Sequence, residues 1–204
     1  MDITYLGAGS VKLSGKNLNI ITDPLVPGKA EVVTASGPGG EGANWPVAEH
    51  AMLINGPGEY EVKGAMITGI PAMLHIDEQG YRGTAFSILI DGVNVVVVGN
   101  ISGKLDEDHL EQLGQVDVLV VPVGGNGLTL DSEGAAAVVA QLEPGYVVPV
   151  HYDDGVTQYP VPQSGVDKFL KEMGVNPEPE SKLRVNAKEI PTETQVVVLT
   201  RAGA

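Results

Sequence analysis

Short runs of β-branched and aliphatic residues, separated by turns rich in glycine, fill the first half of the chain and most constrain its fold. In chain order these runs are ITYLG, NLNIITD, EVVT, AMLIN, YEVKG, AMITGI, AFSILIDG and VNVVVVG. Strands that follow one another so closely, with tight turns between them, predict a meander of mostly antiparallel strands.

From residue 106 onward, strands alternate with helices. DEDHLEQL predicts a short helix, DSEGAAAVVAQL a helix with Asp131 as its N-cap, and SGVDKFLKEMG a helix capped by Ser164 and closed by Gly174. VDVLVVPV, YVVPVHY, LRVNA and TQVVVL predict the remaining strands. Because such apolar strands need cover on both faces, we expect an α/β fold of two stacked mixed sheets with outer helices. No linker divides the chain, so residues 1–204 are expected to form one domain.

Charge and composition exclude several classes of function. The formal net charge is −14, with 12 Lys and Arg spread along the chain, which argues against a nucleic-acid partner. The absence of cysteine excludes disulfides and thiolate metal ligands. The N-terminus lacks the pattern of a signal peptide, and no apolar run is long enough to span a membrane. We therefore expect an acidic, cytoplasmic protein without a membrane partner.

Several motifs in sequence order resemble those of small metallo-β-lactamase-fold hydrolases. DITYLG, IITDP, GPGEYEV and DGVNVVVVGN are followed by VDVLVVPVGG and TLD at the spacing of that family. The resemblance covers nearly the whole chain. It implies a four-layer αβ/βα sandwich, whose active members bind one or two zinc or related ions in a groove at the sheet edges.

The resemblance also locates a metal-binding motif that this chain lacks. Active members carry His-x-His-x-Asp-His in the loop after the strand that is EVVT here, where the side chains converge on the metal and help to generate a bound hydroxide. In this chain the loop reads ASGPGGEGAN. When the motif is aligned on Ser36, its histidines fall on Gly37, Gly39 and Gly42, and its aspartate falls on Glu41.

Other ligand positions implied by the resemblance are partly retained. His75, after the GIP run, and His151, after the VVPV run, match two further family histidines. Asn100 stands in place of the bridging aspartate, and Ala8 stands where relatives often have a histidine. The loss of several ligands from one site indicates a vestigial metal centre.

Two functional hypotheses follow. The first is a catalytically silent pseudo-hydrolase that acts as a binding or assembly module for an unknown small molecule or protein, with no cofactor. The second is a hydrolase with a rebuilt mononuclear site, in which His75, His151 and a carboxylate from Asp23, Glu41 or Asp153 hold zinc or another divalent ion. Metal-free catalysis by serine and histidine has no supporting G-x-S-x-G motif, and GPGGEG lacks the Lys-Ser/Thr ending of a phosphate-binding loop.

Overall fold

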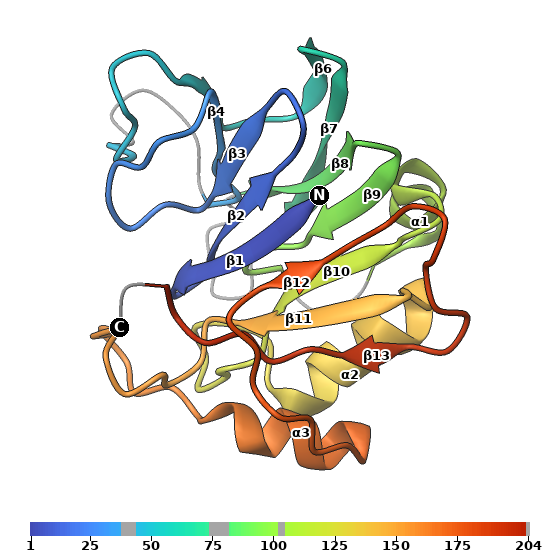
Figure 1. The fold of residues 1–204 in the computed structure, drawn as a ribbon. Helices are drawn as coiled ribbons and strands as arrows, with labels where there is room; N and C mark the ends of the chain where they lie inside the picture. The colour runs from blue at the N-terminus through green and yellow to red at the C-terminus, as the bar shows by residue number, and fades with distance from the viewer. Residues whose placement is uncertain (38–43, 74–81, 102–104, 203–204) are drawn as a thin grey trace.

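Two β-sheets face each other in a computed structural model that describes residues 1–37, 44–73, 82–101 and 105–202 (Figure 1). The first sheet has six strands in the order β12-β1-β2-β3-β4-β5. Their bounds are β1 Asp2–Gly7, β2 Ser10–Ser14, β3 Asn19–Thr22, β4 Val32–Thr34, β5 Met52–Ile54 and β12 Leu183–Arg184.

The second sheet has seven strands in the order β13-β11-β10-β9-β8-β7-β6. Their bounds are β6 Gly58–Val62, β7 Ala65–Met73, β8 Arg82–Ile90, β9 Val93–Val97, β10 Val118–Pro122, β11 Tyr146–Val150 and β13 Gln195–Val196. The strands β9, β10, β11 and β13 are parallel to one another, whereas β6 to β9 are antiparallel. The expected pair of stacked mixed sheets is therefore confirmed.

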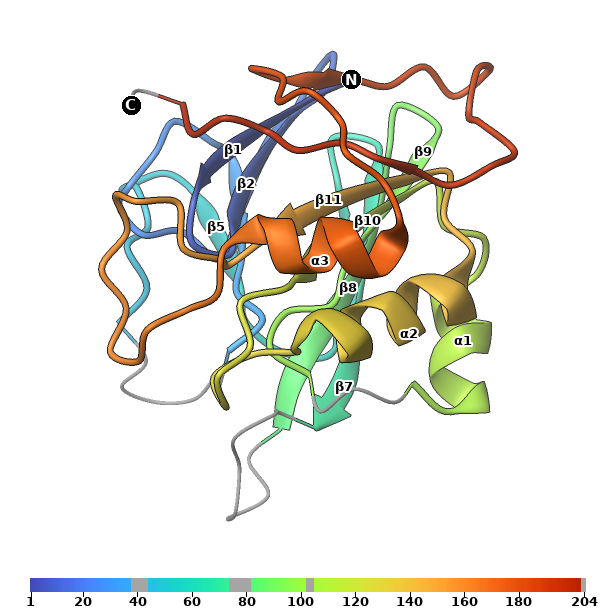
Figure 2. The same cartoon turned by 90° about the horizontal axis from the view of Figure 1, so that it is seen from below.

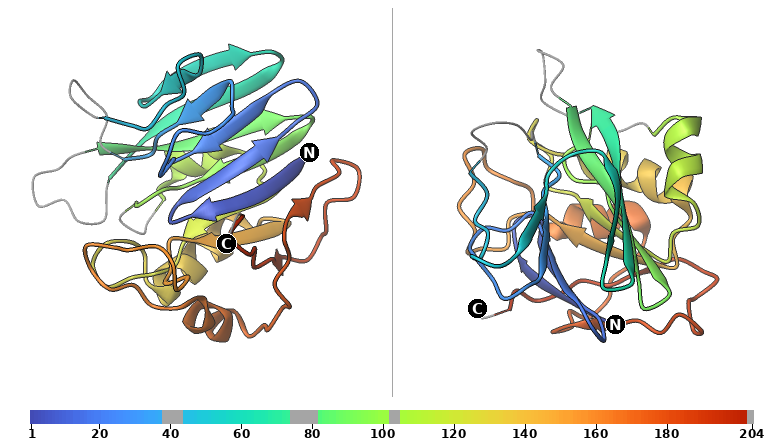
Figure 3. Two further views of the ribbon diagram at one scale, coloured as in Figure 1. Left: turned by 60° about the vertical axis from the view of Figure 1, so that its left-hand side comes forward. Right: turned by 90° about the horizontal axis from the view of Figure 1, so that it is seen from above.

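In the part of the chain that the structure describes, three helices lie on the side of the second sheet: α1 Glu107–Leu113, α2 Ser132–Leu142 and α3 Val166–Met173. In Figure 3, α1 and α2 lie on the face of the seven-stranded sheet that points away from the six-stranded sheet. Helix α3 lies beside α2 and contacts it (Figure 2). Within the described residues, no helix is long and apolar enough to cross a membrane.

The predicted meander is correct for β1 to β3 and for β6 to β9, but β3, β4 and β5 are parallel. Long loops separate these three strands, so each new strand re-enters from the same end of the sheet, which a tight turn cannot achieve. Strand β2 was not predicted as a separate element. It forms because Gly7 and Ala8 both have positive φ angles, 108° and 48°, at the turn from β1, and alanine rarely adopts such a conformation.

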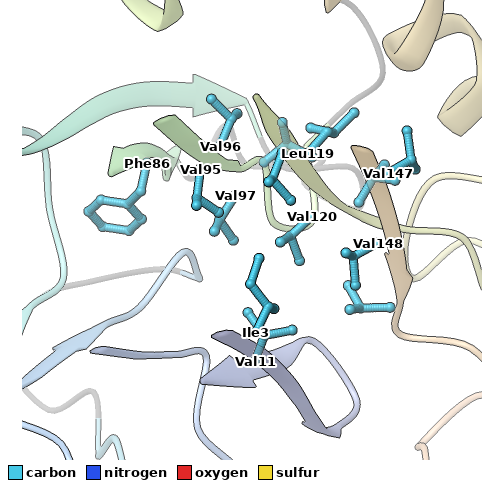
Figure 4. Packing of buried hydrophobic residues seen from close by; sticks show 14 of the residues in the cluster. Ile3, Val11, Phe86, Val95, Val96, Val97, Leu119, Val120, Val147 and Val148 are labelled. Carbon is cyan, nitrogen blue, oxygen red and sulfur yellow. The ribbon is translucent and has the colours of Figure 1, made fainter. Parts of the chain in front are cut away.

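The core lies between the two sheets. Ile3 of β1 and Val11 of β2 face Val97, Val120 and Val148 of the second sheet (Figure 4). The intervening residues Val96, Leu119 and Val147 point to the other face and are also buried (Figure 4). Both faces of these strands are thus covered, which explains why the sequence shows unbroken apolar runs instead of alternation.

The helix ends match the sequence analysis with one exception. The Asp131 carboxylate accepts the Gly134 N–H at 2.8 Å, and Gly174 ends α3 in the left-handed conformation. The prediction of Ser164 as the N-cap of α3 is wrong, because Gly165 occupies that position without a side-chain bond. Ser164 instead joins its loop to the loop after β10, because its N–H donates to the Gly124 carbonyl, and its hydroxyl accepts from Lys168 Nζ of α3.

Candidate functional site

A cavity of about 190 Å³ opens at the edge of the sandwich where the carboxyl ends of strands from both sheets meet. Residues that follow β1, β3 and β4 line one side of it, and residues that follow β9 and β11 line the other. Loops at the carboxyl ends of parallel strands commonly hold ligands, because the strands there end at the same edge. The polar side chains of the lining are Asp23, Ser36, Trp45, Asn100 and His151.

Asp23 is fixed at the cavity by Ser36. The Ser36 backbone N–H donates to Asp23 Oδ1 at 2.7 Å, and the Ser36 hydroxyl donates to Oδ2 at 2.8 Å. Gly99 packs directly against this pair, since a β-carbon at position 99 would lie 2.3 Å from Ser36 Oγ. The loops after β3, β4 and β9 are therefore held together at a point where only glycine fits.

His151 approaches the cavity from the other sheet in an unusual backbone conformation. Its φ angle is 52°, and its N–H donates to the Ala8 carbonyl at 2.6 Å, which joins the loop after β11 to the loop after β1. Gly9 separates His151 from Asp23: a β-carbon on Gly9 would lie 3.8 Å from His151 Cδ2 and 3.7 Å from Asp23 Cβ. The imidazole and the carboxylate thus flank one small glycine.

Two residues of the following loop orient the His151 ring. The Tyr159 ring packs on it with a centroid separation of 4.7 Å. Gln163 also neighbours the ring, and its amide group donates to the Val161 carbonyl at 2.9 Å. His151 Nδ1 and Gln163 Oε1 are both buried, and neither makes a hydrogen bond within the described residues. In a neutral imidazole one ring nitrogen carries the proton and the other accepts, so the His151 ring has one acceptor nitrogen.

Burial shifts the ionisation of both cavity groups. It raises the pKa of Asp23 to about 6, although the two bonds from Ser36 oppose this shift. Burial lowers the pKa of His151 below its ordinary value, and the neighbouring Gln163 only partly offsets that effect. At neutral pH the site therefore contains a neutral imidazole and a largely ionised carboxylate.

The raised pKa of Asp23 predicts a pH-dependent stability. Between its ordinary value of 3.8 and about 6, the carboxyl group ionises in the unfolded chain but stays protonated in the folded one. The free energy of unfolding should therefore fall as pH rises through this window, by roughly 3 kcal/mol at about 1.4 kcal/mol per pKa unit. Asp23→Asn removes this contribution while its amide can still accept from the Ser36 N–H.

Urea unfolding of the native protein and of Asp23→Asn at pH 4, 5, 6 and 7 measures the difference. The native protein should lose stability relative to the variant as pH rises from 4 to 6. Ser36→Ala should extend the fall to higher pH, because it removes one donor to the carboxylate. Parallel curves for the native protein and Asp23→Asn would show that Asp23 has no raised pKa.

The structure brings five of the predicted positions to the cavity lining: Ala8, Asp23, Gly37, Asn100 and His151. Asp153, a proposed alternative ligand, is not among the lining residues, and its Oδ1 accepts the Gly155 N–H instead. The remaining predicted positions lie outside the described residues: Gly39, Glu41, Gly42 and His75.

Trp45 is a cavity residue that the sequence analysis missed. A β-carbon on Gly37 would lie 3.1 Å from Trp45 Cζ2 and 3.2 Å from Cη2, so the indole ring fills the space next to this position. Tyr159 and Gln163 were missed as well. The sequence contained one clue, which concerned Trp45: it is the single tryptophan of the chain, and it directly follows the glycine loop.

The described residues do not fit a catalytic divalent ion. A catalytic zinc site takes three protein ligands. Among the residues that the structure describes, no group of three or more His, Asp or Glu side chains could hold a metal. His50 is exposed, and His109 bonds to Asp106 and to the Pro71 carbonyl at the start of α1. Asp23 and His151 thus supply two metal ligands, and the described residues supply no third.

Comparison with known proteins identifies related sequences. A profile of the Beta-lactamase superfamily domain matches residues 2–151. A UPF0173 metal-dependent hydrolase of Natranaerobius thermophilus is 26% identical over 151 residues, which is 74% of this chain and 62% of the relative. Another, from Thermococcus onnurineus, is 32% identical over 100 residues, 47% of this chain and 44% of the relative. The matched segment thus spans about half to three fifths of these relatives.

Solved structures extend the similarity over the full chain. A proposed zinc-dependent hydrolase of the metallo-β-lactamase superfamily from Thermotoga maritima is 28% identical, with a TM-score of 0.77 and 98% coverage of both chains. The metallo-β-lactamase fold protein YhfI from Bacillus subtilis is 12% identical, with a TM-score of 0.60 over 100% of this chain and 98% of YhfI, and so shares the fold. The metallo-β-lactamase type of sandwich expected from the sequence motifs is therefore confirmed, and within the described residues its outer helices lie on the seven-stranded sheet.

Proposed function

The chain belongs to the β-lactamase superfamily, and from this premise we propose that it is a relative of metal-dependent hydrolases that no longer hydrolyses a substrate. In this proposal, the cavity at the sheet edge binds a small molecule, and the protein acts through that binding. The net charge of −14 disfavours a nucleic-acid partner.

The position of Trp45 is the observation that carries this proposal. The family motif, aligned on Ser36, implies a metal-binding histidine at the position of Gly37. Here a β-carbon at position 37 would already contact the indole ring at 3.1 Å, so an imidazole there would require the ring to move. An aromatic side chain that fills this space favours a binding cavity over a metal centre from which one ligand is missing.

Metal-free hydrolysis is also disfavoured by the contacts of the cavity. Nucleophilic catalysis by serine requires a base within hydrogen-bond distance of the hydroxyl group. Ser36 donates its hydroxyl proton to Asp23, and no hydrogen bond joins this hydroxyl to the His151 ring among the described residues. The serine and the histidine therefore do not form a nucleophile–base pair.

A mononuclear hydrolase is the second candidate, and the position of Asp23 favours it. Its Oδ2 and His151 Cδ2 lie 3.9 and 3.8 Å from the same point beside Gly9, so the two side chains flank one space. With Asp23 as the carboxylate, His75 would have to supply the third ligand. The names of the relatives as metal-dependent hydrolases support this candidate.

Metal analysis separates the two candidates. Protein purified without chelator should contain much less than one equivalent of zinc, iron or manganese, and EDTA should leave the melting temperature unchanged, since the core between the sheets is apolar. Hydrolysis of β-lactams, phosphodiesters and lactones should remain at background with added zinc or manganese. Metal-dependent turnover that disappears in His151→Ala would overturn the proposal that the protein is catalytically inactive and establish the mononuclear site.

A further inference from the structure

The electrostatic character of the cavity indicates which kind of molecule it can bind. No lysine or arginine is among the described residues that line it. Among the described residues, the Asp23 carboxylate accepts only from the neutral groups of Ser36, and its two oxygens retain further lone pairs. A partly buried carboxylate without a cationic partner is stabilised by a ligand that brings a positive charge.

The other polar groups of the lining include acceptors and donors. The neutral His151 imidazole has one ring nitrogen with a lone pair, and the Asn100 amide has a carbonyl oxygen and an NH2 group. The Ser36 hydroxyl proton is already used by Asp23, and the buried Trp45 Nε1–H has no hydrogen-bond partner among the described residues. The Asp23 carboxylate is thus the charged group of the described lining, and it selects a ligand that brings a positive charge.

Aromatic and apolar side chains complete the lining. The indole of Trp45 presents a π-system, the side-chain type that binds organic cations best through its face. Leu25 lines the mouth of the cavity and is 44% exposed, and Pro24 lies next to it. These groups can cover the hydrocarbon part of a ligand whose charged end points to Asp23.

We propose that the cavity binds a small organic cation, a primary amine on a short apolar body, with its ammonium group against Asp23 and its body against Trp45 and Leu25. The inference names the ligand class of the proposed function and rests on it. The volume of about 190 Å³ lies below the range of roughly 300–1,000 Å³ for drug-sized ligands, so about ten non-hydrogen atoms is the upper size. An anionic ligand would lie next to the negative charge of Asp23, and no lysine or arginine among the described lining residues could offset the repulsion.

Trp45 provides a direct readout, because it is the single tryptophan of the chain and lines the cavity. Titration with benzylamine at pH 7.5 should change its fluorescence in a saturable manner. Benzyl alcohol and benzoate have nearly the same shape but are neutral and anionic. Each should bind at least about tenfold more weakly than benzylamine, because neither forms a charged hydrogen bond with the carboxylate.

Two variants locate the binding group. Asp23→Asn should weaken benzylamine binding at least about tenfold and leave the binding of benzyl alcohol unchanged. Glu61→Gln, on the exposed edge strand β6, removes the same charge away from the cavity and should bind benzylamine like the native protein. If Asp23→Asn does not fold, the ratio of benzylamine to benzyl alcohol affinity in the native protein, and its decline in 0.5 M KCl, provide the same test.

Equal affinity for the amine and the alcohol, no saturable response to benzylamine, or unchanged amine binding in Asp23→Asn would each overturn the inference. These results are independent of turnover. Selective amine binding by a protein that also shows metal-dependent hydrolysis would contradict the proposed lack of hydrolytic activity but support the proposed class of ligand. Loss of selectivity in an inactive protein would contradict the ligand class alone.

Discussion

Replacement of Gly99 with alanine is expected to lower the free energy of unfolding by about 3–4 kcal/mol. Its φ angle of 60° disfavours any residue with a β-carbon, at a cost of about 1–2 kcal/mol. The new methyl group would also lie 2.3 Å from Ser36 Oγ and 2.4 Å from Ser36 Cβ, and such overpacking typically costs about 1–3 kcal/mol. Urea and thermal unfolding measure the loss, which corresponds to a fall in Tm of roughly 10 °C.

Gly127→Ala is the matched control. Gly127 also has a positive φ angle, 79°, but a β-carbon there would meet no atom within 4 Å. It should therefore show the backbone cost alone, about 1–2 kcal/mol. The double variant Gly99→Ala with Ser36→Gly removes both close contacts and should recover part of the loss. Equal losses for Gly99→Ala and Gly127→Ala would contradict the packing of Gly99 against Ser36.

Restoration of the family ligands is expected to produce a zinc site only when Trp45 is also replaced. The restored variant carries Gly37→His, Gly39→His, Glu41→Asp, Gly42→His and Asn100→Asp. The φ angle of Gly37 lies outside the left-handed region, so a histidine is compatible with the backbone there. The obstacle is the indole ring, 3.1 Å from the β-carbon position, and Trp45→Ala removes it.

Zinc titration by calorimetry compares the five-site variant, the same variant with Trp45→Ala, and Trp45→Ala alone. The combined variant should bind at least one equivalent of zinc about tenfold or more tightly than the five-site variant, since ligand geometry fixes affinity. Trp45→Ala alone should bind no more zinc than the native protein. If the five-site variant binds as tightly as the combined one, Trp45 does not obstruct the ligand position.

The architecture of the sandwich could be predicted largely from apolar patterning, but strand direction could not. Runs such as VNVVVVG and VDVLVVPV indicate strands covered on both faces, and the positions of β9 and β10 confirm it. Whether β3, β4 and β5 are parallel depends on how the loops between them cross the sheet, and local sequence does not specify that path. Strand β2 was missed because its turn depends on Ala8 at a positive φ angle.

For the site, the sequence predicted positions better than contacts. Gly37, Asn100 and His151 were assigned from family spacing, and all three line the cavity. The role of Trp45 depends on a side chain that folds back over Gly37, and the roles of Tyr159 and Gln163 depend on how their loop returns to His151. Such contacts arise from tertiary packing, which spacing along the chain does not encode.

The pairing of β1 with β12, which follows it much later in the chain, has a consequence for synthesis on the ribosome. Strand β1 pairs on one side with β12, and the Met1 amino group donates to the Val185 carbonyl across a separation of 184 residues. One edge of the first strand therefore stays unpaired until nearly the whole chain has emerged. Contacts of such long range slow folding and leave strand edges open to other chains. Nascent chains halted before residue 183 should thus depend on chaperones for solubility far more than the released protein does.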